Sequence, residues 1–560
     1  MNSDVVVLGT GLLQSIVAAA LSKAGFEVIH IDNNQYYGGE DASLSVDELL
    51  EWAKVHDTTS VQLDHNLCPT AAQQRVHSIS FSPDLPPKSR QYSISLAPTI
   101  IPSVGPLIDS LIASGVARYG GFKLLERVAI FDGPGNVQMV PSGKEDIFKS
   151  KELSLVNKRR LMRFLLFAGG EFEGKPEIQG REASPFLPFL RDVFSLDEKS
   201  SRAITYALAF CTSATDQTLP ALQRLRRYIR SAGRYGSSPF LVGHYGGLGE
   251  LSQGFCRTAA VSGGIYVLGR GVTSFQRLEE QPVTPPTSDS DHPPFDNQRP
   301  VWNLSLQEFE QDVRCSVIVS SLDRLPHDET LPLGVTPTDV TKYSFARGIV
   351  IIDTPIRFRP ASQTPVDARS AGAVDVEDHD QQTATDVVDT ALVVFPPSSV
   401  EGGSTVTSVS VLITGEASLS SPKNSWILHF SLPIPGERGE KSASDLLQPY
   451  LDAILTLTTP TTHEMPISPL FTMFYFENRT RIDTKEQGQD SVIIADSFSS
   501  FFPEVSDQIA IDAERCFWQV VEKLKGLGRK PKRKSQSGEE EGDNVDFLWP
   551  PLNTVANDDD

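Results

Sequence analysis

Two glycines and one aspartate near the start of the chain have the types and the spacing that bind a dinucleotide. Gly9 and Gly11 follow a short apolar run at residues 4–8, and Asp32 ends a second run at 27–31. Paired glycines allow a tight turn into a helix whose first N–H groups bind a pyrophosphate. An acid about twenty residues later accepts a hydrogen bond from a ribose hydroxyl. The spacing therefore predicts a βαβ unit of the Rossmann type.

The elements that must position these residues are also visible in the sequence. Residues 4–8 are apolar and mostly β-branched, which is typical of a buried parallel strand. We expect a helix from the glycine turn to about Lys23, ended by Gly25 in a left-handed conformation. Gln14 stands where the G-x-G-x-x-G fingerprint has its third glycine. A glutamine is compatible with the fold if its side chain turns outward, so we expect the fold to be kept and no cofactor to be bound.

The residues after Asp32 carry a family resemblance. Residues 32–40 read DNNQYYGGE, and together with GTGL at 9–12 they resemble the signature of the family that contains the Rab GDP-dissociation inhibitors and the Rab escort proteins. Residues 90–98, RQYSISLAP, resemble a second family block, with Ser95 where an aspartate is usual. The resemblance implies a flavoenzyme-like fold that binds Rab GTPases.

A third block, residues 233–268, is dense in glycine and also resembles the family, with Ser252 in place of a usual proline. The resemblance implies that this block belongs to the platform that binds GDP-bound Rab. By position, it assigns the platform to Tyr37, Glu250, Arg257, Ile265 and Val267. Glu250 and Arg257 are seven residues apart, so on a helix they share one face, where they either contact a partner or pair locally.

Two strand-like runs are expected in residues 122–139. A mostly helical unit follows them, and we assign it to a domain of residues 129–229. We expect helices near residues 152–168, 186–194, 200–211 and 219–232. The resemblance implies that this unit accommodates the geranylgeranyl lipid of prenylated Rab and docks the Rab geranylgeranyltransferase α/β heterodimer through Phe148 and Arg159. An exposed aromatic near an arginine is typical of an interface hot spot. For Phe148, a hydrophobic staple at a helix start is the alternative.

Composition excludes several classes of function. The 560 residues carry a formal net charge of −21, which argues against nucleic-acid binding because little would offset phosphate repulsion. The five cysteines are scattered without a C-x-x-C pair, which indicates reduced thiols and no metal site. No apolar run has the length of a membrane span, and the first strand begins too early for a signal peptide. We expect a cytoplasmic protein with transient membrane contact, and the basic run at 523–534 leaves a nuclear pool open.

These patterns together predict an α/β protein: an FAD/NAD(P)-binding, Rossmann-like multi-sheet large domain with a smaller all-helical second domain. The expected boundaries are 1–128 and 230–525 for the large domain, 129–229 for the helical domain, 55–88, 281–300 and 360–385 for insertions, and 526–560 for a flexible tail.

The resemblance implies an escort function. Such a protein binds unprenylated, GDP-bound Rab, presents it to the transferase and escorts the prenylated Rab to membranes, as a non-catalytic accessory subunit. Trp52, Phe148 and the insertions favour this branch over an inhibitor that recycles prenylated Rab. A flavin-dependent oxidoreductase is the more distant alternative, disfavoured by Gln14 and by the lack of recognisable substrate chemistry.

Overall fold

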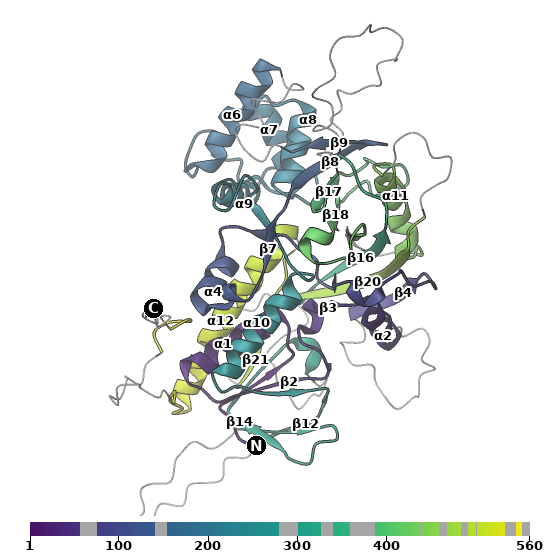
Figure 1. Cartoon of the computed structure of the whole chain (residues 1–560). Helices are drawn as coiled ribbons and strands as arrows, with labels where there is room; N and C mark the ends of the chain where they lie inside the picture. The colour runs from purple at the N-terminus through teal and green to yellow at the C-terminus, as the bar shows by residue number, and fades with distance from the viewer. Residues whose placement is uncertain are drawn as a thin grey trace, which may run out of the picture.

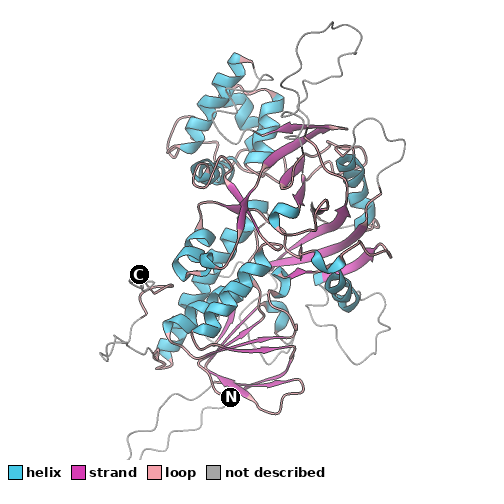
Figure 2. Cartoon of the chain, viewed as in Figure 1, coloured by secondary structure: helices cyan, strands magenta, loops and turns pink. Residues whose placement is uncertain are grey.

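The chain builds two large sheets and a helical unit, arranged along one axis of the molecule (Figures 1 and 2). The computed structural model describes residues 1–56, 75–140, 154–278, 301–325, 340–358, 387–436, 439–458, 468–482, 491–499, 501–532 and 545–550.

The first sheet is parallel and is assembled from distant parts of the chain. Its strand order is β11-β2-β1-β15-β21, with every neighbouring pair parallel. Its strands are β1 (Val5–Leu8), β2 (Val28–Asp32), β11 (Ile265–Leu268), β15 (Val317–Ser320) and β21 (Val492–Ile494). Both faces are covered, so its central strands are buried along their whole length and mostly apolar, as is typical of parallel sheets.

Alternate residues of β1 point to the two covering layers. Val5 and Val7 pack against helices, whereas Val6 and Leu8 pack against a small antiparallel sheet. The helices are α1 (Leu12–Ala24), α4 (Pro106–Ser114), α10 (Leu248–Val261) and α12 (Val505–Gly526), and they lie together in Figure 1. The small sheet consists of β12 (Val272–Arg277), β13 (Trp302–Leu306) and β14 (Val313–Cys315).

The second sheet has eight strands in the order β4-β20-β16-β19-β18-β17-β8-β9, and only the β17–β8 pair is parallel. Its strands are β4 (Val76–Phe81), β8 (Arg127–Gly133), β9 (Asn136–Met139), β16 (Val340–Ile352), β17 (Ala391–Phe395), β18 (Val409–Thr414), β19 (Trp426–Ile434) and β20 (Phe471–Ile482). Helix α11 (Ala443–Leu455) packs on one face, and α2 (Val46–His56) packs on the other.

The helical unit lies beyond β8 and β9 (Figure 1). It consists of α6 (Leu155–Gly169), α7 (Phe186–Phe194), α8 (Glu198–Arg202), a π-helical segment (Ala203–Leu208) and α9 (Thr218–Ser231). Phenylalanine rings fill its core; Phe164, for example, contacts Phe186 and Phe194. The short elements that complete the fold are β3 (Ser43–Leu44), β5 (Ile94–Ser95), β6 (Ile101–Pro102), β7 (Phe122–Leu124), β10 (Phe240–Gly243), η1 (Gly39–Asp41), η2 (Ser89–Gln91), η3 (Val116–Arg118), η5 (Leu322–Arg324), η8 (Glu416–Ser418) and η9 (Phe502–Glu504).

Two predicted boundaries differ from the structure. Strands β8 and β9 lie within the predicted helical domain 129–229 or at its edge, but they pair with each other and with β17, so they belong to the eight-stranded sheet. Strand β4 lies in the predicted insertion 55–88, yet it pairs with β20. The partners that tie these strands into the sheet, β17 for β8 and β20 for β4, are far away in the sequence. The predicted insertions 281–300 and 360–385 lie outside the described residues.

Parts of the predicted flexible tail also pack against the fold. The backbone N–H of Lys532 donates to the carbonyl of Gly25 at 2.7 Å, and its Nζ pairs with Glu27 at 2.9 Å. Further on, Trp549 stacks on Phe255 of α10 with ring centroids 5.8 Å apart, and its indole N–H donates to Ser110 at 3.1 Å. Over these two spans the prediction of a flexible tail is therefore wrong.

Candidate functional site

Helix α10 carries two of the predicted platform residues. Gly246 and Gly247 have φ of +83° and +85°, which suits glycine and allows the tight entry into the helix. Glu250 lies in the first turn, and Arg257 lies two turns later on the exposed face. The guanidinium of Arg257 is 4.6 Å from the ring of Tyr119 and, in the described part of the chain, makes no ion pair with Glu250. The two charges therefore do not pair with each other among the described residues, and their role in binding stays a prediction.

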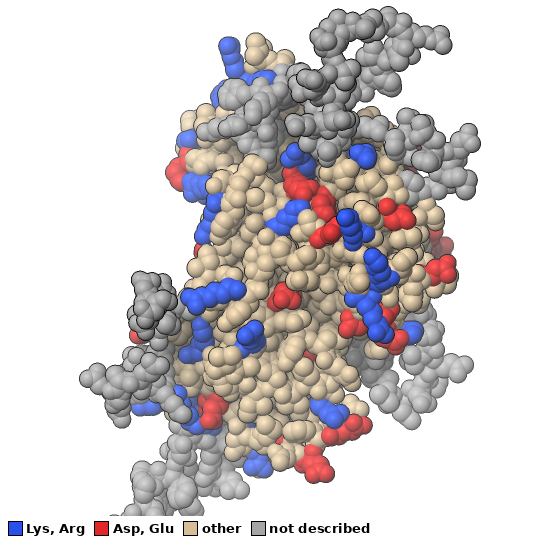
Figure 3. All heavy atoms as spheres, viewed as in Figure 1, with Lys and Arg blue, Asp and Glu red and all other residues tan. Residues whose placement is uncertain are grey.

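The other three platform residues lie beside this helix. Ile265 and Val267 belong to β11, the edge strand that follows α10, and Ile265 is 45% exposed. The ring of Tyr37 makes an edge contact with Tyr266 at 5.7 Å, between these two residues. Side chains alternate along β11, so Tyr266 faces α10 and Tyr37, whereas Val267 packs against the small antiparallel sheet. The structure thus brings Tyr37, α10 and β11 together but does not put all five predicted side chains on one face. Figure 3 shows that the side of the molecule carrying α10 is mostly uncharged, with isolated basic and acidic side chains, which is typical of an interface core.

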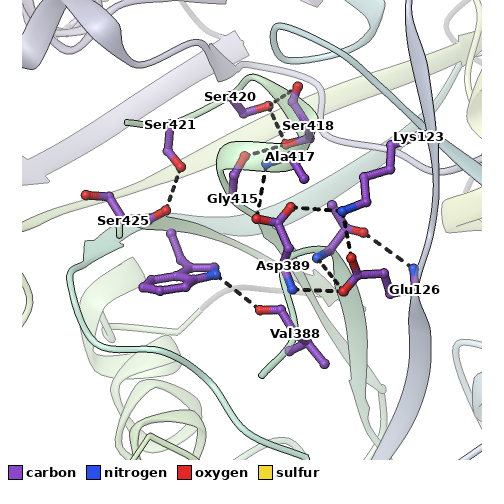
Figure 4. Close-up of polar contacts among 12 residues, drawn as sticks. Lys123, Glu126, Val388, Asp389, Gly415, Ala417, Ser418, Ser420, Ser421 and Ser425 are labelled. Atoms are coloured by element: carbon purple, nitrogen blue, oxygen red, sulfur yellow. Dashed lines mark hydrogen bonds and ion pairs between the residues drawn. The ribbon is translucent and has the colours of Figure 1, made fainter. Parts of the chain in front are cut away.

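A polar network supports the loop that leads into α10 (Figure 4). Lys123 Nζ lies 2.6 Å from Glu126 and 3.5 Å from Asp389, and Asp389 also accepts a hydrogen bond from the N–H of Ala417 at 3.1 Å. This holds the turn η8 in place, and the carbonyl of Ser418 in that turn accepts from the N–H of Tyr245 at 3.2 Å. The network therefore supports Tyr245 and the turn that leads into α10, the helix that carries Glu250 and Arg257.

The predicted dinucleotide motif has the expected strand–turn–helix backbone. Both carboxylate oxygens of its acid, Asp32, however, already accept hydrogen bonds from other groups of the chain. Oδ2 of Asp32 accepts from the N–H and the hydroxyl of Thr10, both at 2.6 Å, and Oδ1 accepts from the N–H of Asn34 at 2.9 Å. Burial alone would raise the pKa of Asp32, but Arg324 and these hydrogen bonds lower it below its ordinary value. Asp32 is 1% exposed and keeps no free oxygen for a ribose hydroxyl.

The two glycines are also covered by side chains of the chain itself. A Cβ on Gly9 would lie 2.8 Å from Nε of Arg324, and one on Gly11 would lie 2.9 Å from Oε1 of Gln14. The N–H of Leu12, at the start of α1, donates to Asp41 at 2.8 Å. A helix N-terminus of this kind would otherwise bind a phosphate. The residues present therefore do not fit a dinucleotide.

Gln14 does not turn outward as expected. Its Nε2 donates to the carbonyl of Ala495, just after β21, at 3.0 Å, and the residue is buried. The side chain is held inside because the end of β21 supplies a partner for its amide. A cavity of 520 Å³ adjoins this corner, lined in part by Tyr36, Trp52, Arg75 and Arg324. Space remains there, but the groups that would hold a pyrophosphate are occupied.

The predicted docking site is only partly described. Phe148 lies outside the described residues, whereas Arg159 is exposed on α6. Leu155 and Val156 on the first turn of this helix are exposed as well, at 76% and 55%. An arginine beside exposed aliphatic side chains is compatible with a protein interface, so the docking role of Phe148 and Arg159 stays a prediction.

Sequence reasoning missed a cluster of buried charges beside the cavity. Glu477 on β20 accepts from Arg347 at 2.8 Å and from Arg479 at 2.5 Å, and it also lies 3.5 Å from Arg75. Arg75 in turn pairs with Glu40. The partners come from β16, β20 and the start of β4, and no spacing in the sequence indicates that they meet.

The described residues hold no further candidate of two kinds, a membrane-spanning helix or a metal site. No helix there is long and apolar enough to cross a membrane. No group of three or more histidine, cysteine, aspartate or glutamate side chains in these ranges has the geometry of a metal site.

The parallel sheet with helices on one face and a small antiparallel sheet on the other defines a Rossmann-like protein of the FAD/NAD-binding type. Residues 1–292 match the family model described as GDI, GDP dissociation inhibitor. The chain belongs to this family, since the match covers more than half of its length.

Curated relatives agree with this assignment. The Rab proteins geranylgeranyltransferase component A of Candida albicans is 35% identical over 286 residues, covering 50% of this chain and 43% of the relative. The same component of Drosophila melanogaster is 36% identical over 288 residues, covering 48% of this chain and 53% of the relative. Rab escort protein 1 of Arabidopsis thaliana is 28% identical over 474 residues, covering 77% and 76%. The chain spans about half the length of the first two relatives.

Solved structures support the fold alone. The Rab GDI of Plasmodium falciparum superposes with a TM-score of 0.60 at 17% identity, covering 94% of this chain and 98% of that one. An oxidoreductase from Methanosarcina mazei superposes with a TM-score of 0.52 at 11% identity, covering 92% of this chain and 99% of that one. The fold is thus common to proteins of different function.

Proposed function

We propose that this chain is a Rab escort protein: it binds unprenylated, GDP-bound Rab GTPases and presents them to Rab geranylgeranyltransferase. The observation that carries the proposal is that Glu250 and Arg257 on α10 lie beside β11 and the Tyr37–Tyr266 contact, in a chain of this family. The names of the curated relatives, which include transferase component A and Rab escort protein, support the same function.

In this proposal the chain does no bond chemistry. The platform holds the folded part of the GTPase, the helical unit contacts the α/β heterodimer through Phe148 and Arg159, and the same unit accommodates the lipid after transfer. Holding substrate and enzyme together raises the effective concentration of the reacting cysteines, which is sufficient to accelerate transfer. The protein then carries the prenylated GTPase from the cytoplasm to a membrane.

The test is a reconstituted prenylation reaction. Purified transferase heterodimer, unmodified Rab loaded with GDP and geranylgeranyl diphosphate are combined with and without this chain, and lipid attachment is measured by mass spectrometry. We expect attachment only when the chain is present. Attachment that is equally fast without the chain would contradict the proposal.

A GDP-dissociation inhibitor is the second candidate, favoured by the family model and by the structural match to a Rab GDI. It predicts a different result: the chain would extract prenylated Rab from vesicles without supporting prenylation. The same preparation measured in both assays separates the two functions.

A further inference from the structure

Two charged side chains, Asp41 and Arg324, contact the groups that bind a dinucleotide in other Rossmann-like proteins, and the loop beside them carries Tyr37 of the platform. We propose that Asp41 and Arg324 act as internal ligands in place of a cofactor and thereby position Tyr37 for the partner. The proposal deepens the proposed function and rests on it for its binding step.

Asp41 occupies the anion site at the start of α1. Its Oδ2 accepts from the N–H of Leu12 at 2.8 Å, and the residue is only 8% exposed. The N-terminal end of a helix attracts negative charge, and α1 has no acidic residue of its own in its first turn. Because Asp41 ends η1, this contact fixes the far end of the segment 33–41.

Arg324 fixes the near end of the same segment. It extends from η5, just after β15, and its Nη1 donates to Asn33 at 2.9 Å and to Asp32 at 3.3 Å. Nη2 lies over Gly39, 3.4 Å from where a Cβ would stand. One guanidinium thus connects the segment after β15 with both the start and the end of the loop 33–41. The single ammonium group of a lysine could not make these contacts at the same time.

Tyr37 lies between these two anchors. The N–H of Gly38 donates to the hydroxyl of Thr10 at 3.1 Å, and that hydroxyl donates to Asp32, so the backbone next to Tyr37 is tied to the carboxylate that Arg324 neutralises. The outer contact of the Tyr37 ring is the edge contact with Tyr266. Loss of the inner anchors would therefore release the ring from the surface it shares with β11.

The first measurement is amide hydrogen exchange, followed by mass spectrometry of peptides that cover 33–41. In Arg324→Lys and in Asp41→Ala we expect these amides to exchange about tenfold faster or more, since a buried hydrogen-bonded pair is lost. Arg224→Lys is the control: Arg224 is even more buried than Arg324, but it donates to Ala209 in the helical unit. Unchanged exchange in both variants would overturn the internal-ligand assignment, whether or not the chain binds a GTPase.

The second measurement is affinity for GDP-bound Rab in a double-mutant cycle. We expect Arg324→Lys to weaken binding about as much as Tyr37→Ala, and the double variant to be no weaker than Tyr37→Ala alone. Additive losses would show that Arg324 does not act through Tyr37. Asn33→Ala removes only an exposed contact of Arg324 and should give a smaller effect in the same direction, which tests the pathway if Arg324→Lys does not fold. Absence of binding by the unmodified chain would refute the proposed function instead, while the exchange result still decides the internal ligands.

Discussion

Glu477 shows how strongly the ionisation of a buried group depends on its neighbours. Burial alone would raise the pKa of Glu477, but Arg479, Arg347 and Arg75 lower it from 4.5 to about 2. The folded chain therefore keeps this carboxylate charged at a pH where the unfolded chain has already protonated it. Removing it would leave three largely buried arginines without their shared carboxylate.

This residue should make the protein sensitive to acid. The stabilisation from Glu477 is complete above pH 4.5 and is lost as the pH falls through about 2. We expect Glu477→Gln to lower the free energy of unfolding by roughly 3 kcal/mol at neutral pH, and to lose this part of the acid slope. Urea unfolding at several values between pH 2 and 7 measures both effects. Glu308→Gln, whose partner Arg270 is exposed, is the control and should change little; equal effects in the two variants would contradict the argument.

Glu250 and Arg257 of α10 are expected to affect binding of the partner and not the stability of the fold. Arg257 stacks on Tyr119 without a carboxylate partner in the described residues, so its removal costs the fold little and the interface much. We expect Arg257→Ala and Glu250→Ala each to weaken GDP-bound Rab binding about tenfold or more in a titration calorimetry experiment. Arg191→Ala, an exposed arginine of the helical unit, should leave the affinity unchanged. Wild-type affinity in both α10 variants would remove the platform assignment.

At the scale of elements, α4 and α12 share an apolar core and are joined at their starts by one carboxylate. Asp507, in the first turn of α12, accepts from the N–H of Leu107 at the start of α4 at 3.2 Å. Gly105 stands directly against it: a Cβ there would lie 2.4 Å from Oδ2 of Asp507. The helix end and the carboxylate fit only because residue 105 has no side chain.

Two glycine substitutions should therefore change stability in opposite directions. Gly105→Ala must displace Asp507 and should destabilise the protein by about 1–3 kcal/mol. Gly526→Ala, at the last position of α12 with open space around it, should stabilise by up to about 1 kcal/mol, because alanine favours a helix. Thermal unfolding of the two variants side by side measures the difference. A stabilised Gly105→Ala would show that the α4–α12 junction is loose.

The elements also show what the sequence could predict. Helix α7 was predicted to the residue, because its apolar face and its proline-rich start are local signals. Strand β4 was missed because it lies in a proline-rich stretch and has only one neighbour in the sheet. The sequence suggested that the cofactor site was defective at Gln14, but it gave no sign that Arg324 and Asp41 fill that site. Their contacts exist only once distant segments have been brought together.

At the scale of the whole molecule, the platform and the helical unit are separate surfaces with separate cores. Helix α10 packs into the core around α1 and α12, whereas α6 packs into the phenylalanine core of the helical unit. Binding of the GTPase and recruitment of the transferase should therefore be separable by mutation.

We expect Phe148→Ala and Arg159→Ala to abolish co-purification with the transferase heterodimer while Rab affinity is kept. Arg160→Ala, the next exposed residue on α6, is the matched control and should recruit normally, because it points about 100° away around the helix. Normal recruitment by both Phe148→Ala and Arg159→Ala would show that the transferase docks elsewhere.

The position of α1 has a consequence for synthesis. Almost every residue of α1 is buried, and part of what buries it is α12, which begins at Val505. The ribosome adds about 5–20 residues per second, so roughly half a minute to two minutes pass between the synthesis of α1 and that of α12. During this time the apolar surface of α1 that α12 covers stays without its partner. Strand β1 waits in the same way for β15, its neighbour in the sheet. The nascent chain is therefore an expected client of chaperones that shield apolar surface until translation is nearly finished.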